Sequence, residues 1–176
     1  MAPQELRCND DWFYYFAYGS NLLDERMHIK NATFEKIGLL PGYRLEFFDY
    51  GRRWKGAVAS IEQSEDDEVW GCIWRVPWSF SDELDLQEGG YHRLIVDVKA
   101  GNATVRCRTY QYSNPARQPG SPSPHYKQVI VSGAVEHHLP LDYIMKLKAV
   151  KHNGYKGAVL VDLAAIKNLN SCNTSD

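Results

Sequence analysis

The feature that most constrains the fold of this chain is segment 68–76, which is apolar on both faces of an extended conformation. Successive side chains of a strand point to opposite faces. The two sets are Val69, Gly71 and Ile73 on one face, and Trp70, Cys72 and Trp74 on the other. A strand of this kind must be covered on both sides, which favours a sheet closed into a barrel, with helices around it.

Five further segments predict strands, at residues 12–18, 43–48, 57–62, 94–99 and 104–112. Segment 12–18 is a continuous aromatic run that suits a buried strand. The last two alternate with one face inward and one outward, and the pattern puts Arg108 and Tyr110 on the outward face of segment 104–112.

Helices are predicted at fewer places. Segment 22–29 follows a Gly-Ser-Asn turn, 82–88 begins behind Ser81 and stops at two glycines, and 141–150 begins behind a proline. Segment 159–169 is a weaker candidate, and the proline-rich stretch 113–124 predicts a loop. Because strands outnumber helices, we expect an α+β fold: a mixed or antiparallel, six-stranded, barrel-like sheet with peripheral helices.

The composition excludes several classes of protein. The 176 residues are 44% hydrophobic and 24% charged, which predicts one domain over residues 1–176. A formal net charge of -2 gives no basic field, so no nucleic acid partner is expected. No apolar run approaches the roughly 20 residues that span a bilayer, and the polar first residues lack a signal-peptide core. We therefore expect no membrane partner and a cytoplasmic location.

The turn formed by Tyr18, Gly19, Ser20 and Asn21 is the first candidate site. It joins a predicted buried strand to a predicted helix. Unpaired backbone N–H groups of such a turn and of the helix start could bind a carboxylate or a developing oxyanion. The alternative is a plain structural turn in which Ser20 or Asn21 caps the helix.

Glu88 is the second candidate. It falls in the last turn of a predicted helix, where the helix dipole disfavours negative charge. With partial burial, this position would raise its pKa toward the range useful to a general base. Its acidic neighbours Asp82, Glu83 and Asp85 look like charges of a helix start or of a solvated face, and Glu88 itself could be a solvated surface glutamate.

Three tyrosines near strand or loop ends, Tyr91, Tyr110 and Tyr126, suit the lining of a pocket, although they could equally pack in the core.

The histidine spacing predicts no metal site, and no motif for a serine hydrolase, a P-loop or a dinucleotide site is present, so no cofactor is expected. Trp54, among basic residues 52–55, is interpreted as part of a solvated loop.

Several blocks together resemble the γ-glutamylcyclotransferase family. They are, in order, F-A-Y-G-S-N-L-L at 16–23, D-E-V-W-G at 67–71, L-D at 84–85 with Q-E-G at 87–89, C-R-T-Y at 107–110, P-S-P-H-Y-K at 122–127, G-A at 133–134 and L-P-L-D-Y at 139–143. The resemblance covers about residues 12–157, which we take as the core of the domain, with flexible termini.

The resemblance implies a six-stranded barrel-like fold, a homodimer, and release of 5-oxoproline from γ-glutamyl amino acids without a cofactor. It implies that Glu88 is the catalytic acid–base, and that the γ-glutamyl group is bound by the loop at Tyr18, Gly19, Ser20 and Asn21. Tyr110 and Tyr126 match pocket tyrosines, and Tyr91 is assigned to the pocket with them.

The sequence departs from the family at one point. In the family, a few more residues separate the E-G pair from the next tyrosine, whereas here Gly90 and Tyr91 follow at once. A shorter loop over the pocket would change the substrate range or remove turnover. Two alternatives therefore stay open: a cyclotransferase for γ-glutamylamines or glutathione, and a γ-glutamyl-binding protein with weak or no catalysis.

Overall fold

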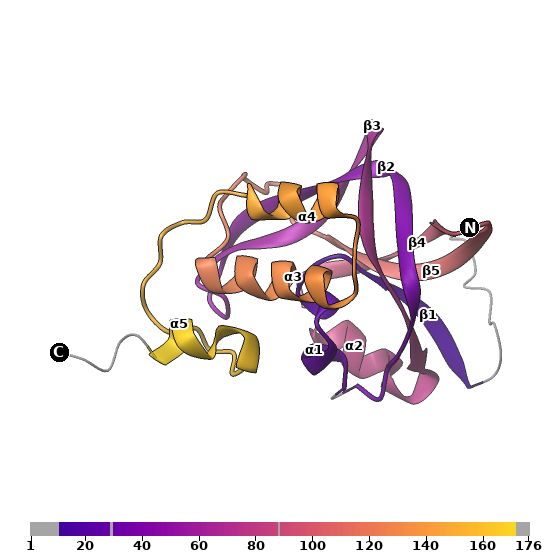
Figure 1. Cartoon of the computed structure of the whole chain (residues 1–176), viewed down its shortest axis with the longest axis horizontal. Coiled ribbons are helices and arrows are strands. Elements are labelled where there is room, and N and C mark those ends of the chain that lie inside the picture. Colours follow the sequence, from indigo (N-terminus) through magenta and orange to yellow (C-terminus); the bar gives the residue numbers. More distant parts are fainter. Residues whose placement is uncertain (1–10, 29, 88, 172–176) are drawn as a thin grey trace.

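A five-stranded, closed β-barrel with helices around it makes up the protein (Figure 1). The computed structural model describes residues 11–28, 30–87 and 89–171. The strands are β1 (Trp12–Ala17), β2 (Thr33–Gly51), β3 (Gly56–Pro77), β4 (Tyr91–Ala100) and β5 (Ala103–Tyr112). Their order around the barrel is β1-β3-β2-β4-β5. Neighbours are antiparallel, except that β1 closes the barrel by pairing in parallel with β5. The α+β barrel is confirmed.

The described residues form five strands and not the predicted six, because two predicted segments belong to one strand. Segments 57–62 and 68–76 are the two halves of β3, and both halves pair with β2, with no partner on β2 for residues 64–67 between them. The pairing shifts register between Pro41 and Tyr43 of β2. Gly42, between them, has a φ of +79°, which glycine adopts easily. Pro41 has no N–H to donate to the strand ladder, so both residues suit a position where the regular pairing is interrupted.

Helices lie against the barrel at two places (Figure 1). The helical elements are η1 (Ser20–Leu22), α1 (Asp24–His28), η2 (Trp78–Phe80), α2 (Ser81–Gln87), α3 (Pro124–Glu136), α4 (Leu141–Lys148), η3 (Ala164–Ile166) and α5 (Lys167–Ser171). The predictions for 82–88 and 141–150 are confirmed over α2 and α4. Segment 159–169 is helical only from Ala164, and residues 159–163 have no regular secondary structure.

One helix, α3, was not predicted. It begins at Pro124, where the proline-rich loop ends, and Ser123 caps it by accepting a hydrogen bond from the Tyr126 N–H at 3.1 Å. The helix packs closely on η1. A Cβ at Gly133 would lie 2.6 Å from the Leu22 Cβ, so only glycine permits this approach.

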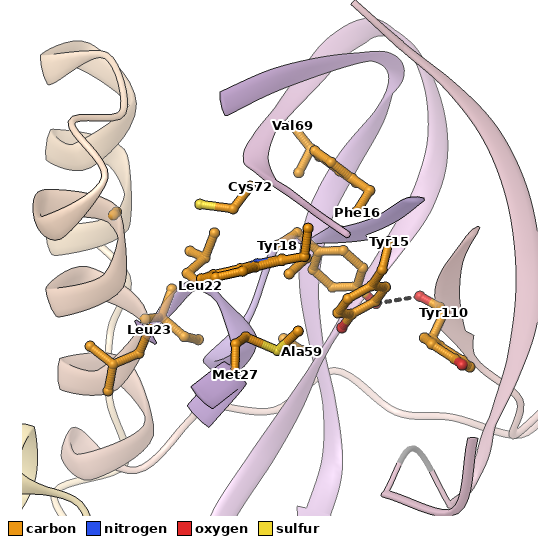
Figure 2. Packing of buried hydrophobic residues seen from close by; sticks show 14 of the residues in the cluster. Tyr15, Phe16, Tyr18, Leu22, Leu23, Met27, Ala59, Val69, Cys72 and Tyr110 are labelled. Carbon is orange, nitrogen blue, oxygen red and sulfur yellow. Dashed lines mark hydrogen bonds between the residues drawn. The ribbon is translucent and has the colours of Figure 1, made fainter. Parts of the chain in front are cut away.

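The core lies inside the barrel and between the barrel and α3 (Figure 2). Phe16 of β1, Leu22, Met27 and Cys72 are fully buried there. The core also continues past residue 157, since Val159, Val161, Leu163 and Ile166 are buried. Among the residues that the structure describes, no helix combines the length and the apolar character needed to cross a bilayer.

Candidate active site

A small pocket, partly open to solvent, is lined by residues of β1, the loop into η1, β3, β4, β5 and α3. All of the predicted substrate-binding residues line it. The lining residues are Tyr15, Tyr18, Gly19, Ser20, Asn21, Ala59, Tyr91, Tyr110 and Tyr126. The structure thus brings together residues from widely separated parts of the sequence, and it adds Tyr15 and Ala59, which the sequence did not single out.

The loop from Tyr18 to Asn21 is fixed to the last strand of the barrel. The Tyr18 hydroxyl donates to the backbone carbonyl of Tyr110 at 2.5 Å, and Thr109 Oγ1 donates to the carbonyl of Phe16 at 2.8 Å. The chain then turns into η1, with the Leu22 N–H bonded to the Gly19 carbonyl at 3.0 Å. No side chain caps η1, and the Asn21 amide is engaged elsewhere, so Asn21 is not a cap.

A network of charged groups backs Tyr110 on the side of α2. The Tyr110 hydroxyl donates to Asp85 at 2.5 Å. Burial, and then this bond to a carboxylate, raise the pKa of the Tyr110 hydroxyl, which keeps its proton at neutral pH. Asp85 also forms an ion pair with Arg93 and lies 3.5 Å from Arg108.

Asp85 corrects a prediction, because it is only partly exposed and binds three side chains instead of facing open solvent. Burial on its own raises the pKa of this carboxyl, but hydrogen bonds from Arg93 and Tyr110 outweigh that effect. The positive charges of Arg93 and Arg108 act in the same direction. The pKa of Asp85 therefore lies below its ordinary value.

Arg108 corrects the outward face predicted for segment 104–112. Its residue exposure is 1%, and its guanidinium lies 4.0 Å from the centre of the Phe13 ring. It donates to Ser81 Oγ at 2.9 Å. Both faces of β5 are covered here, one by the barrel interior and one by α2 and η2, and a simple alternation of residue types does not reveal this second cover.

The opposite wall of the pocket is held by one backbone position of β3. The Ala59 N–H donates to the Tyr126 hydroxyl at 3.2 Å, and the Ala59 carbonyl accepts from the Tyr91 hydroxyl at 2.6 Å. Trp54 stacks behind Tyr126, with ring centres 4.8 Å apart. Trp54 is buried, so its assignment to a solvated loop was wrong; the ring is the packing support of a pocket residue.

Tyr15 of β1 lines the pocket and makes an edge-type ring contact with Tyr110, with the ring centres 5.8 Å apart (Figure 2). Its hydroxyl accepts a hydrogen bond from Asn21 Nδ2 at 3.1 Å. The pattern of the aromatic run predicted that Tyr15 is buried, but nothing in a strand pattern tells which buried ring borders a cavity.

Comparison with known proteins gives close relatives. The chain is 39% identical over 175 residues to a γ-glutamylcyclotransferase of Bos taurus, covering 93% of this chain and 92% of the relative. It is 40% identical over 169 residues to a γ-glutamylcyclotransferase of Homo sapiens, covering 90% and 89%. The chain belongs to the γ-glutamylcyclotransferase family.

Two further similarities agree with this family. A solved structure described as γ-glutamyl cyclotransferase superposes with a TM-score of 0.83 at 37% identity, covering 90% of this chain and 98% of the other. Residues 68–147 match the model of the AIG2-like family.

The predicted catalytic residue of this γ-glutamylcyclotransferase family member, Glu88, lies outside the described residues. The structure describes its surroundings on both sides. Helix α2 ends at Gln87, directly before it, and is tied to the pocket by Asp85 and Tyr110. Gly89 and Gly90 form a turn that leads into Tyr91, so the connection between α2 and the pocket wall is short.

Three groups that could bind a metal ion lie together, although none was predicted to do so. His137 Nε2 is 2.8 Å from Asp24 Oδ1, and Glu136 Oε1 accepts from the Asp24 N–H at 2.8 Å. These contacts account for the cluster as a link between the end of α3 and the start of α1. The expectation that the protein has no metal site stays an expectation.

Proposed function

We propose that this protein is a γ-glutamylcyclotransferase that converts γ-glutamyl amino acids into 5-oxoproline and a free amino acid, with Glu88 as the proton shuttle. The observation that carries the proposal is the pocket: in a member of this family, it gathers every residue that the sequence assigned to the γ-glutamyl group. Enzymatic activity of this type follows from the family itself, through relatives 39–42% identical over most of the chain.

The reaction needs orientation and proton transfer. The α-amine of the substrate attacks its own γ-carbonyl, a five-membered lactam closes, and the amino acid leaves with the amide nitrogen. Because the nucleophile and the electrophile belong to one molecule, a pocket that holds the folded-back conformer supplies much of the acceleration. The amine is mostly protonated at neutral pH, so a base must remove a proton, and an acid must return one to the leaving nitrogen.

Glu88 would serve as this base and then as this acid. It follows directly on α2, whose Asp85 contacts the pocket tyrosine Tyr110. The backbone N–H groups of Gly19, Ser20 and Asn21 would hold the γ-glutamyl moiety and stabilise the tetrahedral oxyanion. Tyr91, Tyr110 and Tyr126 would form the walls against which the substrate folds.

The decisive experiment is an assay of 5-oxoproline release from γ-glutamyl-alanine, γ-glutamyl-ε-lysine and glutathione. Glu88→Gln should lower turnover of the preferred substrate by about 100- to 10,000-fold, the usual contribution of a positioned acid–base. Glu83→Gln, which removes an exposed carboxylate from the same helix, is the matched control and should keep wild-type turnover. Near-normal activity of Glu88→Gln would exclude Glu88 from the mechanism.

The same panel separates the alternatives. Release only from γ-glutamyl-ε-lysine or only from glutathione would assign the enzyme to one of the related substrate classes. The short connection through Gly89 and Gly90 favours, as a second candidate, a protein that binds γ-glutamyl groups without turnover. If the folded protein releases no 5-oxoproline from any of the three substrates but still binds 5-oxoproline, that candidate would be supported.

We propose further that the protein is a cytoplasmic homodimer, as the family resemblance implies. Large apolar side chains are exposed on the surface, among them Leu86, Leu141, Met145 and Leu160, and a second copy could cover some of them. Light scattering on a size-exclusion column would give the mass in solution. A mass of one chain at micromolar concentration would exclude the dimer.

A further inference from the structure

Tyr91, one of the pocket tyrosines, packs on a ring that lies outside the pocket lining. Tyr112 is directly opposite Tyr91 in the pairing of β4 with β5, and the two rings meet edge to face with their centres 5.4 Å apart. Aromatic pairs of this kind across two strands hold each other in place. Tyr112 is also fixed to β3, because its backbone N–H donates to Ser60 Oγ at 2.9 Å. The position of Tyr91 therefore depends on what holds Tyr112.

The end of β2 holds the Tyr112 side chain. The Tyr112 hydroxyl donates to Asp49 Oδ2 at 2.7 Å, and Phe48 stacks on the Tyr112 ring with the ring centres 6.3 Å apart. The Asp49 carboxylate also accepts from Asn114 Nδ2 at 2.9 Å and from the Gln118 N–H at 2.8 Å. Hydrogen bonds to a carboxylate are stronger than those to a neutral acceptor, so Asp49 is a firm anchor for this ring.

The backbone of Asp49 has an uncommon conformation. Its φ is +54°, in the left-handed region that aspartate adopts more readily than most other residues. The residue lies where the pairing of β2 with β3 shifts register, between Phe48 and Gly51. The Asp49 N–H donates to the Gln118 carbonyl at 2.8 Å, so the main chain and the side chain of Asp49 both hold the loop after β5. A conformation that so many contacts maintain is a reason to look for a function.

The short turn before β4 rests on the same ring. Gly90 has a φ of +89°, and its carbonyl accepts from the Ser113 N–H at 2.9 Å. A Cβ at Gly90 would lie 3.8 Å from Tyr112 Cε2, so the turn lies against the Tyr112 ring. The turn leads directly into Tyr91. Tyr112 thus supports both the pocket tyrosine and the turn that precedes it.

We propose that Asp49 is a positioning residue that acts through Tyr112 to keep Tyr91 and the turn at Gly90 in place for the γ-glutamyl group. The inference rests on the proposed function, which makes Tyr91 a wall of the substrate pocket. Without the carboxylate, the Tyr112 ring loses its anchor on β2, and the wall occupies its binding position for only part of the time. The affinity for substrate and for product then falls by the fraction of molecules that can bind.

The test compares kinetic constants for γ-glutamyl-alanine. Asp49→Gly removes the side chain and keeps a residue that adopts a positive φ easily. It should raise KM by about tenfold and leave kcat within about threefold, because ordering of the wall is needed equally in the ground state and the transition state. Asp49→Asn keeps the backbone preference and an acceptor for Tyr112, and should restore KM to within about threefold of wild type. An unchanged KM in Asp49→Gly would overturn the inference.

The control is Asp97→Asn. Asp97 is an exposed aspartate that pairs with Arg106 near the opposite end of the β4–β5 hairpin. This variant should change neither KM nor kcat. A rise in KM equal to that of Asp49→Gly would contradict a specific role of Asp49.

A second variant tests whether Asp49 acts through Tyr112. Tyr112→Phe removes only the hydroxyl and should raise KM by about three- to tenfold. The double variant Asp49→Gly/Tyr112→Phe should be no worse than Asp49→Gly alone, because both changes remove one contact. An unchanged KM in Tyr112→Phe, or effects that multiply in the double variant, would overturn this role of Tyr112. If Asp49→Gly does not fold, Tyr112→Phe decides the question.

Calorimetric titration with 5-oxoproline separates this inference from the proposed function. The Kd of 5-oxoproline should rise in Asp49→Gly by about the same factor as KM, which a mere loss of stability would not produce in a folded protein. Binding by wild type that is weakened about tenfold in Asp49→Gly would support the positioning role even if no substrate is turned over. Turnover by wild type with unaltered binding in Asp49→Gly would overturn the role of Asp49 alone. A wild-type protein with neither turnover nor binding would overturn both.

Discussion

The two walls of the pocket position the same type of side chain by different means. Tyr110, on the side of α2, is held by an ionised carboxylate that two arginines compensate. Tyr126 and Tyr91, on the opposite side, are held by the backbone of Ala59, and Trp54 packs behind the first of them. One wall thus depends on buried and half-buried charges, and the other on neutral hydrogen bonds and ring packing.

This difference predicts how each wall fails. A charge that loses its partner in a partly dry site leaves an uncompensated ion, which is costly. A neutral hydrogen bond to the backbone contributes little net stability, because water replaces it when it breaks. The charged wall should therefore be the more sensitive to single substitutions and to pH.

The largest effect is expected from Arg108→Met. Loss of this fully buried guanidinium removes a hydrogen bond to Ser81 and a charge beside Asp85, and should lower the free energy of unfolding by about 3–5 kcal/mol. Arg106→Met is the control: Arg106 lies on the same strand and pairs with Asp97 at the surface, so about 1 kcal/mol or less is expected. Urea denaturation measures both, and equal losses would contradict the charged-wall interpretation.

Removal of a single hydroxyl compares the two walls directly. Tyr110→Phe breaks a bond to a charged acceptor and should cost about 1.5–3 kcal/mol of unfolding free energy. Tyr126→Phe breaks a bond from the neutral Ala59 N–H and should cost about 1 kcal/mol. The same denaturation experiment measures the order of the two variants. A larger loss of unfolding free energy in Tyr126→Phe than in Tyr110→Phe would contradict the prediction that the charged wall is the more sensitive one.

The smallest expected effect is a pH dependence of stability that arises only from the charged wall, on the side of α2. The pKa of Asp85 is lowered on folding, so its contribution to stability is fully present above the unfolded value, about 3.9, and is lost as pH falls through the folded value. The difference in stability between wild type and Asp85→Asn should therefore shrink below about pH 4. Thermal unfolding from pH 7 to pH 3 measures this difference, with Asp82→Asn as the control for the substitution itself. A difference that stays constant with pH would contradict the role of Asp85.

The sequence predicted those parts of the molecule that local pattern determines. The apolar faces of segment 68–76 and the aromatic run at 12–18 led correctly to a barrel. The Gly-Ser-Asn turn and the tyrosines at strand ends led to residues that line one pocket.

What the sequence did not reveal depends on distant contacts. Helix α3 was missed because its β-branched run and Gly133 weaken the helical pattern, whereas packing on η1 requires that glycine. Trp54 and Asp85 looked solvated because each sits among charged neighbours, and only the folded chain shows that a ring or an arginine covers them. Lys30 gave no sequence signal at all, since its partner Asn21 becomes visible only in space.

The parallel closure of β1 on β5 has a consequence for how the site arises. The bond between Tyr18 and the Tyr110 carbonyl joins groups 92 residues apart. Strand β1, which is synthesised first, therefore cannot complete its pairing until β5 has been synthesised. Contacts of such separation form late, because the chain must pay the entropy of closing a long loop before they stabilise it. The β2–β3 and β4–β5 hairpins can form early, but none of them contains the pocket. Ligand binding should thus be the last property to return during refolding. A nascent chain whose β5 has not yet left the ribosome should not bind ligand.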